Sequence, residues 1–151
     1  MRVVADSGGI IAAINSAEPD HDAYLLVLES AATAFVTPLV VTEVHHLLMA
    51  AGLAAAADGF LEDVIGGFYE LVNPTVADVE VAGELVRRYR GSMQSKPGSL
   101  DLADAMNIVV AGAKATNLIV ATDQDYRRVV PLSGHPAFAL LPQDLASHAP
   151  R

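Results

Sequence analysis

Short apolar runs alternate with longer amphipathic segments along most of this chain. The runs have the length of buried strands, and they lie at 2–5, 34–37, 69–72, 118–121 and 138–141. Strands that alternate with helices in this way predict a parallel sheet with right-handed crossovers and helices on both faces. We therefore predict a single α/β domain over 1–145, built on a five-stranded sheet, and a short tail over 146–151.

The segments between these runs carry helix signals. Helices are predicted at 7–16, 22–31, 38–51, 53–65, 75–90, and from 99 or 101 to about 116. Ser7 can cap the first of them, Pro38 suits a first helical turn, and Thr75 with an acid nearby marks another start. The stretch GSMQSKPGS is the clearest predicted loop.

Composition narrows the class of protein. A hydrophobic content of 52% with 18% charged residues excludes a disordered chain. A mean hydropathy of +0.38 indicates apolar surface that a partner or a second copy would cover. The absence of cysteine excludes disulfides and thiolate metal ligands. No apolar run approaches the ~18 residues of a membrane span, and Asp6 interrupts the N-terminal run, so we expect a soluble cytoplasmic protein without membrane contact.

Acidic residues lie where parallel strands would bring them together. Asp6 and Asp123 follow strand-like runs, while Glu43 and Asp104 lie in the early turns of predicted helices. In open parallel sheets, ligands bind beyond the carboxyl ends of the strands. Carboxylates gathered there repel one another unless a cation joins them, and oxygen ligands without cysteine favour Mg²⁺ or Mn²⁺. Such an ion suits phosphodiester hydrolysis, because it polarises a phosphoryl oxygen and lowers the pKa of bound water.

Each acid also has an ordinary structural explanation. Asp6 could cap the helix that follows it, the helix dipole favours Asp104, and Asp123 could begin a turn. Only the convergence of these side chains points to a metal site. Asp101, about one turn before Asp104, and Asp125, two residues after Asp123, are alternative ligands, and we favour Asp104 over Asp101.

In its acidic motifs the chain resembles the PIN-domain family, and most of all the VapC-type toxins of bacterial toxin–antitoxin pairs. The likeness runs from Val3 to about Leu141. It depends on motifs that occur in order, namely Asp6-Ser7, Pro38-x(4)-Glu43, Ala103-Asp104-Ala105, and Thr122-Asp123 followed by Asp125-Tyr126. The chain departs from the family in having Gly8-Gly9 after the first acid, and in the direct adjacency of Thr122 and Asp123.

This resemblance implies a five-stranded parallel sheet that binds Mg²⁺ or Mn²⁺ and cleaves RNA. It assigns catalytic roles to Asp6, Glu43, Asp104 and Asp123. The first and the last two would hold the ion, while Glu43 would orient or deprotonate the attacking water or act as a further ligand. Ser7 and Thr122 would support the acids. The resemblance also implies a small antitoxin partner and a homodimer, which would cover apolar surface along 10–14, 39–53 and 54–68.

Basic and histidine residues offer further candidates. Arg87, Arg88 and Lys96, with Arg127 later in the chain, could hold RNA phosphates beside the acids, although cations at a helix C-terminus are also favourable for structural reasons. His45 and His46 are adjacent in a predicted helix, so their side chains point about 100° apart and cannot share one ion. We predict no zinc site there.

Two other interpretations of the acidic edge are open. A receiver-like or other phosphoryl-transfer domain could use a similar edge, but a receiver needs an Asp after its third strand and a Lys after its fifth. The segments YELVNPT and FALLPQD supply neither. A catalytically silent binding module could keep the same fold, and it would differ by failing to bind Mn²⁺.

Overall fold

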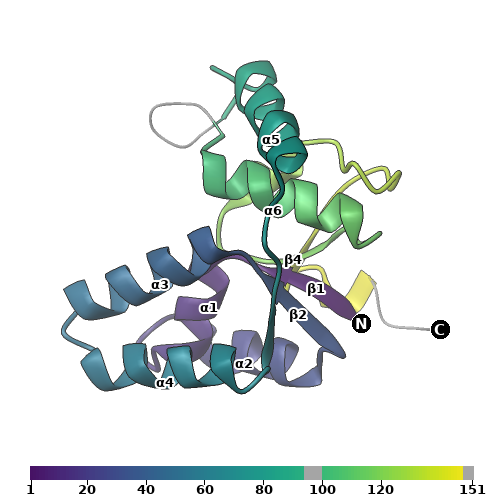
Figure 1. The fold of residues 1–151 in the computed structure, drawn as a ribbon. Coiled ribbons are helices and arrows are strands. Elements are labelled where there is room, and N and C mark those ends of the chain that lie inside the picture. Colours follow the sequence, from purple (N-terminus) through teal and green to yellow (C-terminus); the bar gives the residue numbers. More distant parts are fainter. Residues whose placement is uncertain (94–99, 148–151) are drawn as a thin grey trace.

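The computed structural model describes residues 1–93 and 100–147. Within these residues five parallel strands form one sheet in the order β3-β2-β1-β4-β5 (Figure 1). The strands are β1 (Arg2–Ala5), β2 (Thr33–Val36), β3 (Tyr69–Leu71), β4 (Leu118–Val120) and β5 (Ala139–Leu141). The helices are α1 (Ser7–Ile14), α2 (His21–Ser30), α3 (Pro38–Ala50), α4 (Ala54–Ile65), α5 (Val76–Arg88) and α6 (Leu102–Ala113), with short 3-10 helices η1 (Gln124–Arg128) and η2 (Leu145–Ser147).

The helices cover both faces of the sheet. Helices α1 to α4 lie on one face, and α5 and α6 lie on the other (Figure 1). Successive side chains of a strand point to opposite faces, so Val3 and Ala5 of β1 are buried in the core under α1 to α4, whereas Val4 is buried under α5 and α6. The predicted α/β fold with a five-stranded parallel sheet is confirmed.

The helix starts follow local signals in the sequence. Thr37 caps α3 by accepting a hydrogen bond from the Val40 backbone N–H at 3.3 Å, and Pro38 occupies the first turn. Thr75 and Asp78 form a reciprocal capping box at α5. The prediction for Ser7 was wrong, because Ser7 is the first residue of α1 and Asp6 occupies the cap position.

Helix ends and short 3-10 helices differ from the predictions. Helix α5 ends at Arg88, not at 90, ahead of Gly91 with a φ of 78°. Helix α6 ends at Ala113, not at 116, because Ala115 adopts a left-handed φ of 53° that a helix cannot continue through. Neither η1 nor η2 was predicted, and η2 includes the first residues of the expected tail. Much of the predicted loop GSMQSKPGS lies outside the described residues.

The order of the strands reverses between β1 and β4. The chain moves outward from β1 to β2 and β3, and then returns to place β4 on the other side of β1. A hydrogen bond of 3.0 Å from the Asp6 backbone N–H to the Val120 carbonyl joins the carboxyl ends of these two strands. The fold therefore has its expected ligand-binding edge where β1 and β4 end. None of the helices within 1–93 and 100–147 is long and apolar enough to cross a membrane.

Candidate active site

Asp6 and Asp104 come together at the carboxyl ends of β1 and β4. Asp6 directly follows β1, and Asp104 lies in the first turn of α6. Two side chains connect them. Asn107 Nδ2 donates to Asp6 Oδ1 at 3.0 Å and to Tyr126 Oη at 3.0 Å, and Tyr126 Oη donates to Asp104 Oδ1 at 3.0 Å. Residues that are about a hundred positions apart in the chain thus form one local cluster.

The pKa values of both carboxyl groups are raised. Burial is the main reason that the pKa of Asp6 rises from 3.8 to about 7, and Glu43 is among the negative charges that add to the effect, while a backbone hydrogen bond at Ser7 opposes it. Burial also raises the pKa of Asp104 from 3.8 to about 8, followed by repulsion from Asp6 and Asp101, while the hydrogen bond from Tyr126 opposes the rise. The charged forms of this pair are therefore costly without a compensating cation.

Three further acids surround Asp6 and Asp104. Glu43 is exposed on α3 and raises the pKa of Asp6. Asp101 caps α6 by accepting from the Asp104 backbone N–H at 2.8 Å, and Asp123 caps η1 by accepting from the Asp125 N–H at 2.8 Å. The charges of Asp101 and Asp123 nevertheless raise the pKa of both Asp6 and Asp104.

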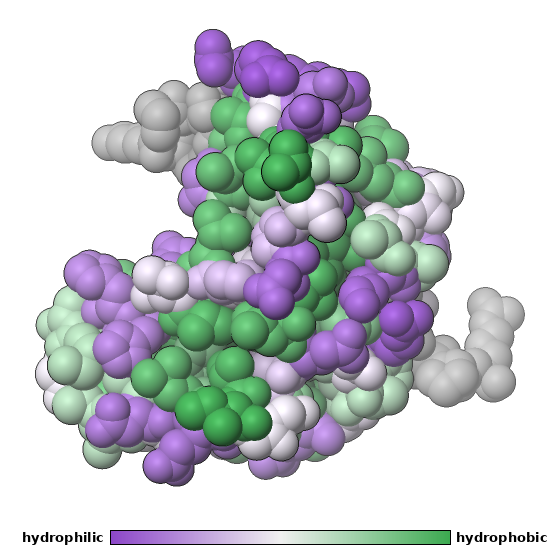
Figure 2. Space-filling view, in the orientation of Figure 1, coloured by the Kyte–Doolittle hydropathy of each residue, from purple (hydrophilic) through white to green (hydrophobic). Residues whose placement is uncertain are grey.

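A cleft of about 580 Å³ opens beside these acids, between the first turns of α3 and the start of α6. The space-filling view shows the molecule hollowed on one side between its two helical layers (Figure 2). Glu43 and Asp101 lie on opposite walls of the cleft, and His46 lines it one turn after Glu43. The other lining residues are Pro38, Leu39, Thr42 and Ala103. A flexible polymer could therefore reach the acids from this side.

The donors fit a hard divalent cation in their chemistry. They are carboxylates, and the pKa values of Asp6 and Asp104 are raised mainly by desolvation and further by repulsion from neighbouring acids, both of which a doubly charged ion would offset. Among the residues that the structure describes, however, no three Asp, Glu or His side chains already point at one common position. An ion held by Asp6, Asp104 and Asp123 together would therefore require at least one of these carboxylates to rotate.

Close packing at the first turn of α1 accounts for the unusual Gly8-Gly9 pair. A Cβ atom on Gly8 would collide with the Thr122 hydroxyl, and one on Gly9 would collide with the Val120 carbonyl. Only glycine lets this helix pack directly against the end of β4. Ser7, which the sequence predicts as a supporting residue, is buried beside Asp6, and Thr122 lies against α1.

Some candidate residues occupy other positions. Asp125 is buried, and its Oδ1 lies 3.8 Å from Arg128 Nε, so the structure favours Asp123 over Asp125 as the neighbour of the acid pair. Arg87 and Arg88 are exposed in the last turn of α5. Lys96 lies outside the described residues.

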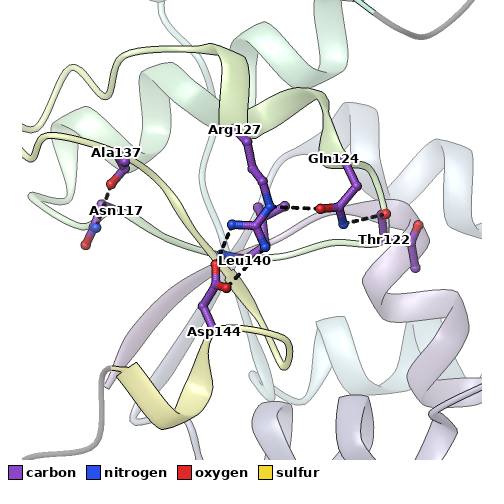
Figure 3. A network of polar contacts seen from close by, with 7 residues as sticks. All are labelled: Asn117, Thr122, Gln124, Arg127, Ala137, Leu140 and Asp144. Carbon is purple, nitrogen blue, oxygen red and sulfur yellow. Dashed lines mark hydrogen bonds and ion pairs between the residues drawn. The ribbon is translucent and has the colours of Figure 1, made fainter.

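The Arg127 side chain is hydrogen-bonded to other residues of the protein. Its guanidinium forms a double hydrogen bond with the Asp144 carboxylate, at 2.8 and 3.1 Å, and its Nε donates to Gln124 Oε1 at 2.8 Å (Figure 3). Asp144 also accepts from the Leu140 backbone N–H at 2.8 Å. These bonds join η1 to β5, so the expected RNA contact of Arg127 gains no support from its geometry.

Sequence reasoning missed Asn107 and Tyr126 as parts of the site. Both are buried, with exposed fractions of 0% and 1%. Asn107 gave one signal, because it is an uncharged polar residue inside the apolar helix AMNIVVAGA, one turn after Asp104. Tyr126 appeared only as the aromatic residue of a motif. Their connection to the acids depends on tertiary structure.

The PIN domain family model matches residues 3–130 of this chain. The chain belongs to the PIN-domain family. A curated relative, Ribonuclease VapC26 of Mycobacterium tuberculosis, is 29% identical over 141 residues, which cover 93% of this chain and 100% of that protein. The family resemblance predicted from the acidic motifs is therefore confirmed.

Solved structures of VapC proteins share the fold of this PIN domain. VapC20 of Mycobacterium tuberculosis, described as a Sarcin-Ricin loop cleaving toxin, matches with a TM-score of 0.69 at 18% identity, over 82% of this chain and 91% of that one. VapBC2 of Rickettsia felis, bound to a DNA fragment from its promoter, matches with a TM-score of 0.62 at 17% identity, over 93% and 97% of the two chains. At these identities the likeness concerns the fold.

Proposed function

We propose that this PIN-domain protein is a metal-dependent endoribonuclease that hydrolyses RNA phosphodiester bonds. The observation that carries the proposal is the pair of buried Asp6 and partly buried Asp104 at the point where the strand order reverses, with raised pKa values and further carboxylates around it. The similarity to Ribonuclease VapC26 along 93% of the chain supports RNA as the substrate.

Mg²⁺ or Mn²⁺ is the proposed cofactor, held by Asp6, Asp104 and Asp123. When bound, the ion would polarise a phosphoryl oxygen and lower the pKa of a bound water. The surrounding protein buries Asp6 and partly buries Asp104, which reduces their contact with bulk water and strengthens the attraction of the carboxylates for a cation. Glu43 stands exposed on the wall of the cleft, where its carboxylate would orient or deprotonate the attacking water.

RNA would enter through the cleft between α3 and α6. Phosphate groups need positive charge nearby, because the chain has a net charge of −9. Arg87 and Arg88 end α5 and are exposed, and with Lys96 they are the proposed phosphate contacts. Replacing both Arg87 and Arg88 with Ala should weaken RNA binding and reduce its salt dependence, and unchanged binding would remove them from the substrate path.

We further propose that the protein acts in the cytoplasm as the toxin of a type II toxin–antitoxin pair, in the form of a homodimer. The VapBC2 structure supports a VapB-type partner through the shared fold. Exposed apolar side chains on and after α3 and α4 offer surface for these contacts, with exposed fractions of 48% for Met49, 85% for Ile65 and 45% for Phe68. Figure 2 shows apolar residues gathered over this part of the molecule. Native mass spectrometry of the isolated protein tests the dimer, and a strict monomer at micromolar concentration would contradict it.

The test of the nuclease activity is incubation with a mixed RNA pool, in Mg²⁺, in Mn²⁺ and in chelator. Wild-type protein should cleave RNA only with metal, and Asp104→Asn should be inactive under every condition. Asp58→Asn provides a matched control, because Asp58 is an exposed aspartate on α4. Cleavage that persists in chelator or in Asp104→Asn would contradict the mechanism. A protein that neither cleaves RNA nor binds Mn²⁺ would be a silent binding module.

A further inference from the structure

The Asn107 side-chain amide and the Tyr126 hydroxyl together connect Asp6 to Asp104. Asn107 uses both hydrogens of Nδ2, one for Asp6 Oδ1 and one for Tyr126 Oη, each at 3.0 Å. Tyr126 then donates its own proton to Asp104 Oδ1, also at 3.0 Å. Both carboxylates are acceptors in this arrangement. We call Asn107 and Tyr126 the acid bridge.

The orientation of the Asn107 amide is unfavourable for Asn107 itself. Its Oδ1 atom is buried and has no hydrogen-bond partner among the described residues. A buried acceptor without a partner costs about 1–3 kcal/mol. The reversed amide would place that oxygen against the Asp6 carboxylate, where two acceptors would repel each other. The Asp6 carboxylate, which accepts from Nδ2, therefore fixes the orientation of the Asn107 amide.

Rigid elements hold both members of the acid bridge. Asn107 lies on α6 one turn after Asp104, so these two residues share a helix face. Tyr126 lies on η1, and its ring packs edge-on against Phe138 with centroids 6.2 Å apart. Both side chains are almost completely buried, so neither can reorient without disturbing the core. The bridge thus fixes Asp6 and Asp104 relative to two different elements.

We infer that Asn107 and Tyr126 are positioning residues, which set the spacing and direction of the Asp6 and Asp104 carboxylates for a divalent cation. The inference rests on the proposed function, since it assigns these residues a role toward the same ion. Groups that hydrogen-bond to metal ligands orient them, and their loss typically lowers metal affinity by about 10- to 100-fold. Neither residue is proposed to touch the ion or the RNA.

The test compares two buried tyrosines that each lose only a hydroxyl group. Tyr126→Phe removes the donor to Asp104. Tyr24→Phe is the matched control, because the Tyr24 hydroxyl is also buried and makes two hydrogen bonds, to the Ala121 carbonyl at 3.2 Å and from Gln143 Nε2 at 2.7 Å. Mn²⁺ affinity is measured by titration calorimetry, and folding by thermal unfolding. Tyr126→Phe should bind Mn²⁺ about tenfold or more weakly than wild type, and Tyr24→Phe should bind as wild type does.

A second variant keeps the inference testable if Tyr126→Phe does not fold. Asn107→Leu removes both donors with a side chain of similar size, and it should weaken Mn²⁺ binding in the same way. The double variant should bind no more weakly than the weaker single variant, because the two residues act as one unit. Affinity equal to that of Tyr24→Phe in either folded single variant, or multiplied losses in the double variant, would overturn the inference. Wild-type protein that shows no Asp6-dependent Mn²⁺ binding would instead overturn the proposed function, and the inference with it.

Discussion

Two polar networks of this molecule differ in how their charges are balanced. In the first, Asp6 is buried and Asp104 is partly buried, and these two acids are joined only by the neutral acid bridge. In the second, Arg127 and Asp144 carry opposite charges, are partly exposed, and form a double hydrogen bond that also involves the Leu140 backbone (Figure 3). In the second network an arginine balances the charge of the carboxylate, whereas the acid bridge of the first network is neutral and balances no charge.

This difference separates a structural role from a functional one. A balanced, partly exposed ion pair contributes a modest amount to stability and needs nothing further. A pair of carboxylates that is wholly or partly buried destabilises the fold unless something neutralises it. The chain keeps such a pair where β1 and β4 end, which is the place where ligands bind in open parallel sheets. The excess of negative charge at this edge of the sheet is therefore the strongest structural argument for a bound cation.

The largest expected effect follows from neutralising one acid of the first network. Asp104→Asn should reduce RNA cleavage by at least about a hundredfold, because a metal ion supplies several kcal/mol of transition-state stabilisation. The same change should raise the melting temperature of the metal-free protein by about 2–4 °C, because the neutral amide avoids the desolvation of a carboxylate and its repulsion by Asp6 and Asp101. Cleavage assays and thermal unfolding in chelator measure the two effects.

The same substitution in the second network is the control. Asp144→Asn should lower the melting temperature, because the amide cannot replace a carboxylate that accepts from Arg127 and Leu140. Cleavage should be retained. If Asp104→Asn and Asp144→Asn both lower stability to the same extent, the two networks do not differ in charge balance as we infer.

The pH dependence of stability tests the first network without a mutation. Folding raises the pKa of Asp6 from 3.8 to about 7 and that of Asp104 from 3.8 to about 8. Between these values the folded state retains protons that the unfolded state has released, so the contribution of these two groups to stability is fully present at low pH and is lost as the pH rises. We expect the free energy of unfolding of the metal-free protein to fall by on the order of a few kcal/mol between about pH 4 and about pH 8.

Urea unfolding in chelator at a series of pH values measures this slope. Asp104→Asn should flatten the slope, and Mn²⁺ should restore stability at the alkaline end because it favours the charged carboxylates. If the stability of the wild-type protein is constant or rises across this range, folding does not raise the pKa values of Asp6 and Asp104 as expected.

A smaller effect concerns the packing that brings the first network together. Gly9→Ala should destabilise the protein by about 1–3 kcal/mol, because the new Cβ collides with the Val120 carbonyl where α1 meets the end of β4. Gly59→Ala is the matched control, since it is a helical glycine in α4 with open space around it, and alanine there should stabilise by about 0.5–1 kcal/mol. Urea unfolding of both variants gives the comparison, and equal effects would argue against the close contact.

The smallest effect is expected in the second network. Arg127→Ala should cost about 0.5–1 kcal/mol of stability, because its partner Asp144 is partly exposed and solvent screens the pair. RNA cleavage should stay within about twofold of wild type, since screened surface pairs of this kind contribute little energy. A large loss of RNA affinity in Arg127→Ala at unchanged stability would instead indicate that Arg127 contacts the RNA.

The strands and most helix starts could be predicted from the sequence because they depend on local patterns, whereas the meeting of Asp6 and Asp104 was inferred from the expected topology of a parallel sheet. The apolar run before Asp6 and the capping pattern at Thr75 are readable within a few residues. The meaning of Gly8-Gly9 was not readable, because it depends on a contact with β4 from more than a hundred residues later in the chain. The role of Asn107 is equally non-local, because an amide in an apolar helix indicates a buried polar contact without naming its partner.

Anomalous diffraction from crystals grown with Mn²⁺ would locate an ion held by Asp6 and Asp104. We expect a single strong peak within coordinating distance of carboxylate oxygens from both residues, and the loss of that peak in Asp6→Asn. A map with no peak between these two side chains, in a crystal where Mn²⁺ binds elsewhere on the protein, would contradict this expectation.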